Sequence, residues 1–413
     1  MDDSLIQKAH QIMAPLIEKM PDTLFGIERQ VYLSTSVQEL TEENRRILNR
    51  LLKAFLERML EIDASDIDMG SLGCRGSIWY RKHGDKKPDP EMGNYTKFET
   101  DLILLNSLME RQTNLLLEKK SIDYSFSFET PGQAEPIRLR ANMYFDLGNL
   151  GLNMRMIAGE IRPISSYNFH PNIAMALSLA HVKKGLVLVT GITGSGKSST
   201  LDSIVDANNK SVDAHIVIIA SPIEHVHTSQ RCVVRHREVG SDVASFKEGT
   251  IQALRQDPDI IVIGEMRDPD TIITALEVTD SGHKVFSTLH TSSAVESIDR
   301  IIGEVPPIEQ ARVRDRLADV LTVAMSQKLP KTIEGKRVLA KEILYMTPPI
   351  RAAIKNNNLN EIYQMLHQGA SLGMVTMEQD LKRLYEENII SYEEALANAN
   401  NKKRFKEIVK YSV

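Results

Sequence analysis

The chain has 413 residues, 42% of them hydrophobic and 25% charged, and a formal net charge of −5. This length allows two or three domains with cores of their own, and so mild a charge argues against a protein that mainly binds nucleic acid phosphates. Two distant cysteines exclude an all-cysteine zinc site and favour a reducing compartment over a disulfide framework, and no apolar run approaches the roughly 18 residues of a membrane span.

The first 61 residues are predicted to form a helical N-terminal extension, with helices over residues 4–20 and 41–61. Thr41 is a candidate N-cap, because its hydroxyl can accept a hydrogen bond from the first turn of a helix. Apolar residues then recur with helical spacing on one face, at Leu48, Leu51, Leu52, Phe55 and Met59. The extension carries no chemical motif, so we expect it to serve in packing or in contact with another protein.

A small α+β domain is predicted over residues 62–162. Strand-like segments lie at 77–84, 99–105, 123–129 and 136–145, and glycine and proline turns separate them. One helix is expected at 106–120. The polar, proline-bounded residues 163–171 are expected to link this domain to the next one.

Strands and helices alternate from residue 172 to residue 304. The strands are the short apolar runs GLVLVTG, AHIVIIA, DIIVIGE and HKVFSTLH. Such runs are typical of strands buried on both faces of a parallel sheet, so an α/β domain is predicted here. Residues 305–413 have a helical pattern, and the chain is expected to be helical to its end.

The octet GITGSGKS, residues 191–198, follows one of these strands and opens a helix. It fits the phosphate-loop pattern G-x-x-x-x-G-K-[ST], in which glycines let backbone N–H groups approach phosphate oxygens and the helix N-terminus adds positive charge. Lys197 is expected to reach the β- and γ-phosphates of a nucleotide, and the Ser198 hydroxyl to bind Mg²⁺. The residues predicted to bind the nucleotide are Gly191, Thr193, Gly194, Ser195, Gly196, Lys197, Ser198 and Ser199.

Glu265 ends the strand DIIVIGE, and the strand KVFSTL is flanked by His283 and His290. Strand C-termini face the nucleotide in a phosphate-loop sheet, so Glu265 is predicted to be the general base and a Mg²⁺ ligand. A histidine beside phosphate can sense the γ-phosphate, which is the catalytic role predicted for His290 and His283. A strand-end carboxylate can also cap the next helix, and a strand-end histidine is more often structural.

The segment IIASPIEHVH, residues 218–227, places Glu224, His225 and His227 close together after an apolar strand. These residue types can bind zinc, but neighbouring residues in an extended strand point to opposite faces. Glu224 would then point away from the two histidines, so a metal site is the minority interpretation. The rim of another active site and a plain strand end are the alternatives.

Taken in order, the motifs GITGSGKSST, SPIEHVH, DPDIIVIGEMRDPDTI and SGHKVFSTLHTSSAVESIDRII resemble those of the secretion ATPase superfamily. The segment TPPIRAAIK (347–355) and the pattern over 371–399 resemble more closely the type IV pilus retraction ATPases, the PilT-like twitching-motility proteins. ASDIDM (64–69) resembles the opening of that family's N-terminal domain. The likeness covers about residues 62–405 and leaves the first two predicted helices outside it.

The resemblance implies a RecA-like phosphate-loop ATPase core over 172–304, a PAS-like N-terminal domain over 62–162 and a helical C-terminal region. It implies a homohexameric ring that binds ATP and Mg²⁺ between the N-terminal domain of one subunit and the ATPase core of another. Arg140 and Arg155 match family arginines that supply catalytic charge across this interface, as arginine fingers do, whereas Gly148 stands where a further arginine is usual. The implied partners are an inner-membrane pilus platform protein and a paralogous pilus ATPase, and the implied location is the cytoplasmic face of that membrane.

One motif departs from the family. Its Asp box usually reads IEDPIE, whereas Ala220 and Ser221 replace the first two acids here and Glu224 remains as the catalytic candidate. A positioned general base contributes about 10²–10⁴-fold to a rate, so the change is expected to slow hydrolysis more than nucleotide binding. Two functions are compatible with this sequence: a motor that powers pilus retraction by ATP hydrolysis, or a low-turnover nucleotide-binding regulator of a paralogous motor. The net charge and the lack of an aromatic-basic stripe disfavour a nucleic-acid motor.

Overall fold

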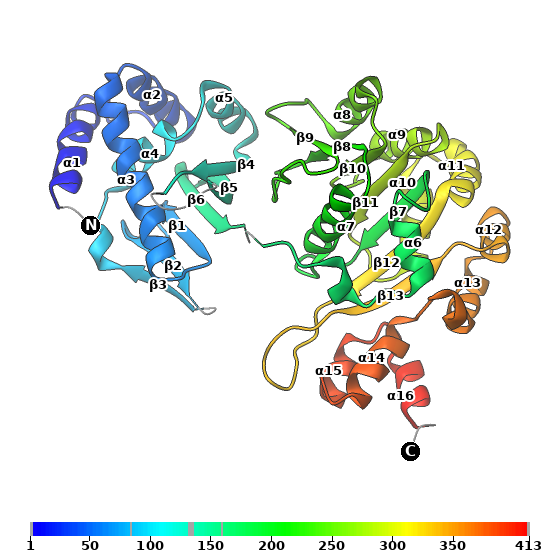
Figure 1. The fold of residues 1–413 in the computed structure, drawn as a ribbon. Helices are drawn as coiled ribbons and strands as arrows, with labels where there is room; N and C mark the ends of the chain where they lie inside the picture. The colour runs from blue at the N-terminus through cyan, green and yellow to red at the C-terminus, as the bar shows by residue number, and fades with distance from the viewer. Residues whose placement is uncertain (1–2, 83–84, 131–135, 158–159, 411–413) are drawn as a thin grey trace. The chain divides into compact units, whose positions relative to one another are not determined.

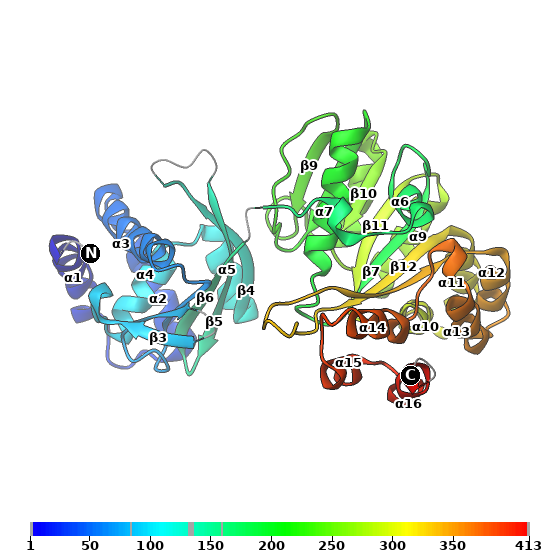
Figure 2. The ribbon, with the colours of Figure 1, turned by 60° about the horizontal axis from the view of Figure 1, so that its bottom comes forward.

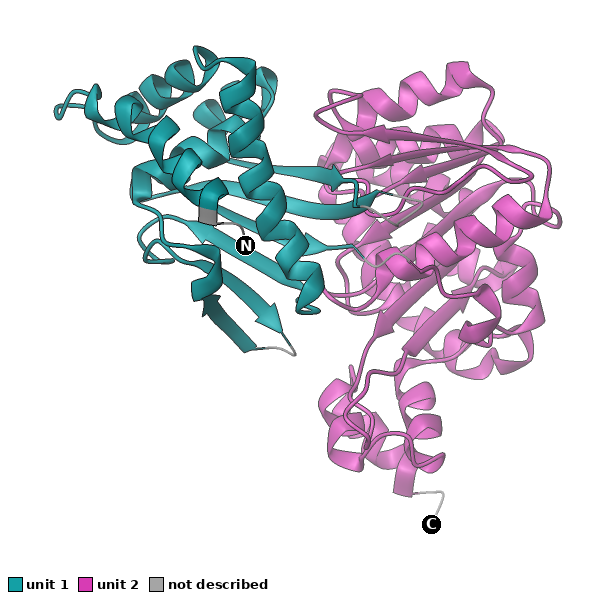
Figure 3. Ribbon diagram, turned by 60° about the vertical axis from the view of Figure 1, so that its left-hand side comes forward, with its two compact units in different colours: residues 1–159 teal, residues 160–413 magenta. Residues whose placement is uncertain are grey.

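The structure of the chain is a computed structural model that describes residues 3–82, 85–130, 136–157 and 160–410. It forms two compact units, unit 1 (residues 1–159) and unit 2 (residues 160–413) (Figure 3). Each unit combines a sheet with helices, which confirms the predicted mixed α/β fold class. Within these described ranges, no helix is both long enough and apolar enough to cross a membrane.

Unit 1 contains a six-stranded sheet, ordered β3-β2-β1-β6-β5-β4, whose neighbouring strands are all antiparallel (Figure 1). Its strands are β1 (Asp66–Gly70), β2 (Ile78–Lys82), β3 (Asp85–Asp89), β4 (Ser121–Phe128), β5 (Ile137–Asp146) and β6 (Asn149–Met156). Its helices are α1 (Asp3–Glu18), α2 (Gly26–Gln38), α3 (Glu42–Glu61), the short η1 (Pro90–Met92), α4 (Lys97–Asn106) and α5 (Glu110–Lys119).

The three N-terminal helices belong to the same core as the sheet. α1 and α3 match the two predicted helices, and Thr41 caps α3 by accepting a hydrogen bond from the backbone N–H of Asn44. Helix α2 has no counterpart among the predicted elements, because its buried face includes the polar residues Arg29 and Gln30 and so lacks an apolar period. All three helices pack with β1, β5 and β6 in one buried cluster, so the segment expected as an extension shares a core with the domain that follows it.

The strand predicted at 99–105 is wrong, because these residues lie in helix α4. Thr96 and Glu99 form a capping box in which each side chain accepts a hydrogen bond from the other residue's backbone N–H, and this starts the helix. Every residue from 99 to 106 is buried, so the helix has no polar face to reveal its period. The helix expected at 106–120 is present as α5.

Unit 2 contains a seven-stranded sheet, ordered β13-β12-β7-β11-β10-β8-β9, in which β12 and β13 are antiparallel and all other neighbours are parallel. Its strands are β7 (Gly185–Thr190), β8 (His215–Ala220), β9 (Val233–Glu238), β10 (Ile260–Ile263), β11 (Lys284–Leu289), β12 (Leu321–Lys328) and β13 (Ala340–Tyr345). Its helices are η2 (Ile164–Tyr167), α6 (Pro171–Leu177), α7 (Lys197–Ser211), α8 (Phe246–Ala253), η3 (Leu254–Gln256), α9 (Pro269–Asp280), α10 (Ala294–Glu304), α11 (Pro307–Val320), α12 (Pro348–Lys355), α13 (Leu359–Gln368), η4 (Ala370–Leu372), α14 (Met377–Glu386), α15 (Tyr392–Asn398) and α16 (Lys402–Lys410).

The prediction of a wholly helical region over 305–413 is wrong, because β12 and β13 lie in this part of the chain and extend the sheet. Helix α11 ends at Val320 and β12 begins at Leu321, so no glycine or proline marks the change from helix to strand. After β13 the chain is mainly helical, and α14, α15 and α16 pack beside one another around Leu381 and Phe405 (Figure 2).

The sheet of unit 2 is buried on both faces, as predicted for its four apolar runs. Along β7, Leu186 and Leu188 join one buried cluster and Val187 and Val189 join another, because alternate residues of a strand face opposite sides. Helices α9, α10 and α11 contribute to the first cluster, and α6 and α7 to the second. Since β7, β8, β10 and β11 are parallel, their carboxyl ends meet at one edge of the sheet, which brings the loops after them together.

Lys284 is a buried lysine at the start of β11, with only 1% of its surface exposed. Its Nζ donates to the carbonyl oxygens of Ala176 and Val182, at 2.7 and 2.8 Å, and so joins β11 to the end of α6 and the turn after it. Burial lowers the pKa of Lys284 to about 7. An unfolded lysine keeps its proton up to about pH 10, so unfolding takes up a proton between the two values and stability rises with pH across that window.

We expect the melting temperature of the wild-type chain to rise relative to that of Lys284→Met between about pH 7 and pH 10, because only the wild-type chain has this proton linkage. Thermal unfolding followed by fluorimetry at a series of pH values measures the difference. Lys184→Met, at an exposed lysine, is the control and should keep a constant offset from the wild-type chain. An equally constant offset for Lys284→Met would contradict the lowered pKa.

Candidate active site

The phosphate loop joins β7 to α7 at the carboxyl edge of the unit 2 sheet. Gly194 and Gly196 have φ values of +81° and +87°, in the left-handed region that favours glycine. A Cβ atom on Gly191 would lie 2.3 Å from Ser195 Oγ, so a larger residue does not fit there. The loop can therefore turn tightly and lead into α7, which begins at Lys197 and presents its N-terminus to the loop.

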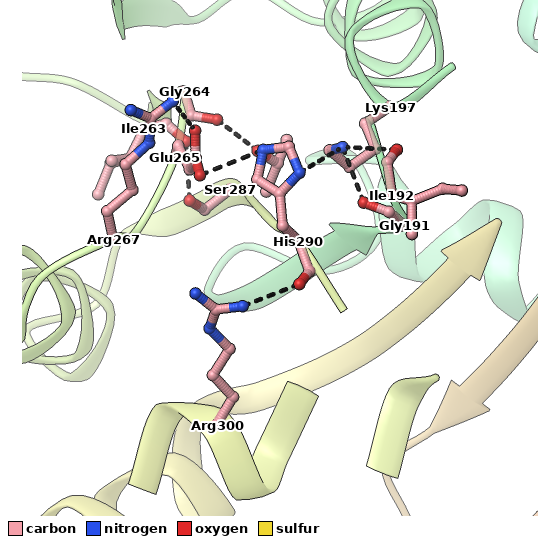
Figure 4. A network of polar contacts seen from close by, with 11 residues as sticks. Gly191, Ile192, Lys197, Ile263, Gly264, Glu265, Arg267, Ser287, His290 and Arg300 are labelled. Carbon is pink, nitrogen blue, oxygen red and sulfur yellow. Dashed lines mark hydrogen bonds and ion pairs between the residues drawn. The ribbon is translucent and has the colours of Figure 1, made fainter. Parts of the chain in front are cut away.

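Lys197 folds back over this loop. Its Nζ donates to the carbonyl oxygens of Gly191 and Ile192, at 2.8 and 3.2 Å, and lies 3.4 Å from His290 Nδ1 (Figure 4). Burial lowers the pKa of Lys197, while the charges of Glu265 and Glu224 oppose this shift. The structure thus places one ammonium group where both carboxylates act on it.

Glu265 and His290 meet beside this lysine, as Figure 4 shows. His290 Nε2 lies 3.2 Å from Glu265 Oε1, and Arg267 Nη2 lies 2.6 Å from Glu265 Oε2. Burial lowers the pKa of His290, the charges of Lys197 and Arg267 lower it further, and Glu265 opposes them. A neutral imidazole can therefore bridge the lysine and the glutamate through its two nitrogens. We call the connected side chains Lys197, His290, Glu265 and Arg267 the polar chain.

Hydrogen bonds from side chains to backbone carbonyl oxygens fix the ends of β10 and β11, next to which Glu265 and His290 lie. Arg300 Nη1 donates to the carbonyl oxygen of His290 at 2.9 Å. Thr288 Oγ1 donates to the carbonyl oxygen of Gly264 at 2.6 Å, which ties the end of β11 to the residue before Glu265. A Cβ on Gly264 would lie 3.1 Å from Ala220 Cα, so glycine allows β10 to pass close to the end of β8.

The other predicted loop residues divide into an exposed group and a buried one. Thr193, Gly194, Ser198 and Ser199 are exposed and so accessible to a ligand from solution, whereas Ser195 is buried. Residues outside the motif support the loop from behind. Gln327 of β12 donates from Nε2 to the carbonyl oxygen of Ser195 at 2.8 Å, and Tyr167 donates from its hydroxyl to that of Ser199 at 3.2 Å.

Several residues of the site were not among the predicted site residues: Tyr167, Arg267, Thr288, Arg300 and Gln327. Arg267 had a local signal, because it follows the predicted Glu265 by two residues. Tyr167, Arg300 and Gln327 come from segments far from the motifs, and only the tertiary fold brings them to the loop and to His290.

The structure does not bring His283 to this site. His283 precedes β11, whereas His290 follows it, so the length of a six-residue strand, about 20 Å, separates their ends. Its Nδ1 lies 3.2 Å from the carbonyl oxygen of Val278 and 3.0 Å from Ser281 Oγ. These contacts place His283 in the turn between α9 and β11, at the opposite edge of the sheet from the phosphate loop.

Arg140 and Arg155 lie opposite each other on β5 and β6 of unit 1. Arg155 Nε is 2.7 Å from the buried carboxylate of Asp66, so Arg155 also neutralises a buried acid. Arg140 Nη2 lies 3.9 Å from Asp123, and both of these side chains are 46% exposed. Arg140 is therefore the arginine that can be removed with less damage to the fold.

Gly148, where the family usually has a third arginine, lies in the turn between β5 and β6 under helix α2. A Cβ atom on it would lie 3.0 Å from Gly26 Cα, and its carbonyl oxygen accepts from Arg29 Nη2 at 2.6 Å. Its φ of +79° also disfavours a side chain. The packing of α2 on this turn explains why an arginine is not accommodated at this position.

Glu224, His225 and His227 lie in the segment after β8. No group of three or more metal-binding side chains is found in the described parts of the chain. His227 Nε2 instead lies 3.2 Å from Asp202 Oδ1, and its ring packs against those of His225 and His236. The charge of Glu224 opposes the lowering of the Lys197 pKa, and Asp202 lies on the helix that begins with Lys197, so we interpret this segment as part of the rim of the phosphate-loop site.

Known proteins are similar to this chain in sequence and fold. The family model described as "Type II/IV secretion system protein" matches residues 41–410. The type IV pilus retraction ATPase PilT of Pseudomonas aeruginosa is 41% identical over 284 residues (69% of this chain, 81% of that protein), and a twitching motility protein of Neisseria gonorrhoeae is 37% identical over 324 residues (78% and 84%). The crystal structure of the pilus retraction motor PilT with bound ADP matches with a TM-score of 0.75 at 34% identity and covers 85% of this chain and 98% of its own. The chain therefore belongs to the type II/IV secretion system protein family and, within it, to the PilT-like type IV pilus retraction ATPases.

Proposed function

We propose that this protein is an ATP-hydrolysing motor that powers type IV pilus retraction as a homohexamer. The observation that carries the proposal is the polar chain, which connects the phosphate-loop lysine to a carboxylate through one histidine. Similarity to PilT, a pilus retraction ATPase, supports the direction of the work. We place the motor in the cytoplasm, at the inner-membrane base of the pilus, with the platform protein as its partner.

The residues at the phosphate loop fit ATP and Mg²⁺. The glycine backbone leaves room for phosphate oxygens, and Lys197 is a buried cation held by neutral carbonyl oxygens and a histidine. Lys197 would neutralise the β- and γ-phosphates, while Ser198 and Glu265 offer the hydroxyl and carboxylate oxygens that Mg²⁺ prefers. When bound, Mg²⁺ would supply positive charge at the phosphate oxygens.

Glu265 is our candidate for the general base. His290 and Arg267 each approach one of its two carboxylate oxygens, which fixes the orientation of the group at the edge of the site. From this position Glu265 would accept a proton from the attacking water. His290 would hydrogen-bond to the γ-phosphate next to Lys197 and so sense its presence. Glu224 would add a second carboxylate from the segment after β8.

Arg140 and Arg155 are proposed to supply positive charge to the nucleotide bound by a neighbouring subunit. In that case Arg140→Ala should lower turnover by about 10²-fold or more, because an arginine finger contributes at least this much. A second subunit type, Lys197→Ala, would lack its own nucleotide site but keep Arg140. Mixing the two inactive proteins in equal amounts should restore activity to at most about a quarter of the wild-type value. About a quarter of the interfaces in a mixed ring would combine an intact Arg140 from one subunit with an intact Lys197 from its neighbour.

Phosphate release by the two variants, measured separately and after mixing and reassembly, tests the shared site. Arg46→Ala, at an exposed arginine of α3 that pairs with Glu42, is the control and should keep full activity. If the mixture stays as inactive as its components, the arginine acts within its own subunit or not at all.

The altered Asp box supports a second candidate function, a low-turnover nucleotide-binding regulator of a paralogous pilus ATPase. Ala220 ends β8 beside Gly264, next to the strand that carries Glu265, and Ser221 is exposed. Carboxylates at 220 and 221 would therefore lie next to the candidate base. If their loss limits hydrolysis, Ala220→Glu with Ser221→Asp should raise turnover by about 10-fold or more with little change in nucleotide affinity.

Steady-state ATP hydrolysis and equilibrium binding of a fluorescent ATP analogue, measured on both proteins, give the answer. Ser241→Asp, in the exposed turn after β9, controls for the added charge. Unchanged turnover after the double substitution would count against the regulator and favour an active motor that relies on Glu265 and Glu224.

A further inference from the structure

The segment of residues 221–230 runs from β8 to the vicinity of β9 and carries Glu224. In the described structure these residues form neither helix nor strand. A backbone without regular hydrogen bonding does not hold a side chain in place by itself, so the position of Glu224 depends on the side chains that hold this segment. Those side chains come from two directions, from β9 and from α7.

From β9, two residues hold the backbone on either side of Glu224. Glu238 Oε2 accepts from the backbone N–H of Ile223 at 3.0 Å, and His236 Nε2 accepts from that of His227 at 3.0 Å. His236 and Glu238 are two residues apart on one strand, so they project from the same side of β9. The bond to His227 requires a lone pair on His236 Nε2, which a neutral imidazole supplies and a protonated one lacks.

From α7, Asp202 holds the side chain of His227. The distance from His227 Nε2 to Asp202 Oδ1 is 3.2 Å, and His227 is 4% exposed. His227 Nδ1 has no hydrogen-bond partner among the described residues, so the proton of a neutral ring belongs on Nε2, where Asp202 accepts it. The rings of His225 and His236 pack against the His227 ring, with centroids 4.8 and 6.1 Å from its own.

These contacts connect Glu224 to the phosphate loop. Asp202 lies on the helix that begins with Lys197, so the Asp202–His227 pair fixes the segment to the element that carries the lysine. The charge of Glu224 opposes the lowering of the Lys197 pKa. A shift of the segment by even 1 Å would move the one acid that remains in the Asp box, and such shifts can cost about 10²-fold in rate.

We propose that His227 is a positioning residue for Glu224, held by Asp202 on the phosphate-loop helix and by His236 on β9. This inference rests on the proposed function, in that Glu224 must contribute to hydrolysis. His227 touches no reacting group in this arrangement. It acts through the segment, and its effect should appear in turnover and not in nucleotide affinity.

The test uses His236, because His227 is buried and its replacement would disturb the packing directly. His236→Gln keeps an acceptor oxygen near the position of Nε2, whereas His236→Leu has a similar volume without an acceptor. Hydrogen exchange followed by mass spectrometry, on the intact chain without nucleotide, should show faster exchange of residues 221–230 in His236→Leu and near-normal exchange in His236→Gln. This exchange measurement does not depend on ATPase activity.

Kinetics then separate positioning from folding. We expect His236→Leu to lower kcat for ATP by about 10-fold or more with KM within about 3-fold of the wild-type value, and His236→Gln to restore most of kcat. In a Glu224→Gln background, His236→Leu should have no further effect, because the two changes disable the same group. Additive losses in this double-mutant cycle, or normal exchange and normal kcat in His236→Leu, would overturn the inference.

These experiments distinguish failure of the positioning role from failure of the proposed motor function. If the wild-type chain hydrolyses ATP and Glu265→Gln stops it while the cycle is additive, only the positioning role fails. If the wild-type chain shows no turnover at all, the proposed motor fails, and unchanged exchange of residues 221–230 in His236→Leu would overturn the positioning role independently.

Discussion

Replacing Glu265 by glutamine should lower the rate of ATP hydrolysis by about 10²–10⁴-fold, the contribution of a positioned general base, while nucleotide affinity changes little. The amide keeps the size of the side chain and an oxygen that can accept a hydrogen bond, but it does not take up the proton of the attacking water. The bond with Arg267, at 2.6 Å in the wild-type chain, would weaken because the charge is gone. Steady-state phosphate release and titration with a fluorescent ATP analogue measure the two effects separately.

Glu304→Gln is the matched control for this substitution. Glu304 is an exposed glutamate at the end of α10, in the same unit but away from the polar chain. Its replacement should leave turnover unchanged. If Glu265→Gln retains more than about half of the wild-type rate, Glu265 is not the base, and Glu224 becomes the remaining acidic candidate at the site.

Replacing Lys197 by alanine should weaken ATP binding by about 100-fold, because the variant loses a cation that makes charge-assisted hydrogen bonds to phosphate. In the wild-type chain this buried ammonium is held by carbonyl oxygens and by His290, so it is already positioned at the loop before any ligand arrives. Equilibrium titration with a fluorescent ATP analogue measures the loss, and thermal unfolding checks that the fold persists.

Lys210→Ala offers a control on the same helix. Lys210 lies near the end of α7, is 55% exposed and pairs with Asp206 one turn earlier. Its removal should change ATP affinity by less than a factor of about two, because an exposed pair contributes little. Equal losses in the two variants would mean that α7 as a whole, and not the position of Lys197, governs binding.

The core of the site was predictable because its signals are local or follow from strand direction. The glycines before Lys197 form a compact pattern that fixes the loop. Glu265 and His290 follow buried parallel strands, whose carboxyl ends meet at one edge, and the structure brings both to the lysine. The same rule places His283 at the other edge, because it precedes its strand, so His283 does not have the position that its predicted role beside the phosphate requires.

The supporting residues could not be predicted, because their positions depend on contacts between distant segments. Gln327 reaches the phosphate loop from β12, a strand with no turn residue at its start, in a region that was predicted to be helical. Arg300 reaches His290 from α10, and Asp202 reaches His227 from α7. None of these side chains has a local pattern that distinguishes it from other polar residues on a helix or strand.

The fold of unit 1 was harder to predict for a related reason. Helix α4 is buried all round and α2 buries polar residues, so neither shows the apolar stripe on which a helix prediction depends. The unpredicted helix α2 also affects the proposed site, at Gly148. The resemblance shows that an arginine is missing there, but only the packing of Gly26 against the turn between β5 and β6 gives a physical reason for its absence.

The most direct test of the account is the Mg²⁺-dependent release of phosphate from ATP by the purified wild-type chain, compared with Lys197→Ala at the same concentration. We predict that turnover in the wild-type chain exceeds turnover in the variant by at least about 100-fold, since residues of the polar chain both bind the phosphates and activate the water. Phosphate release by the wild-type chain that is no faster than release by Lys197→Ala, in a preparation that binds ATP, would contradict the claim that this protein is an ATP-hydrolysing motor.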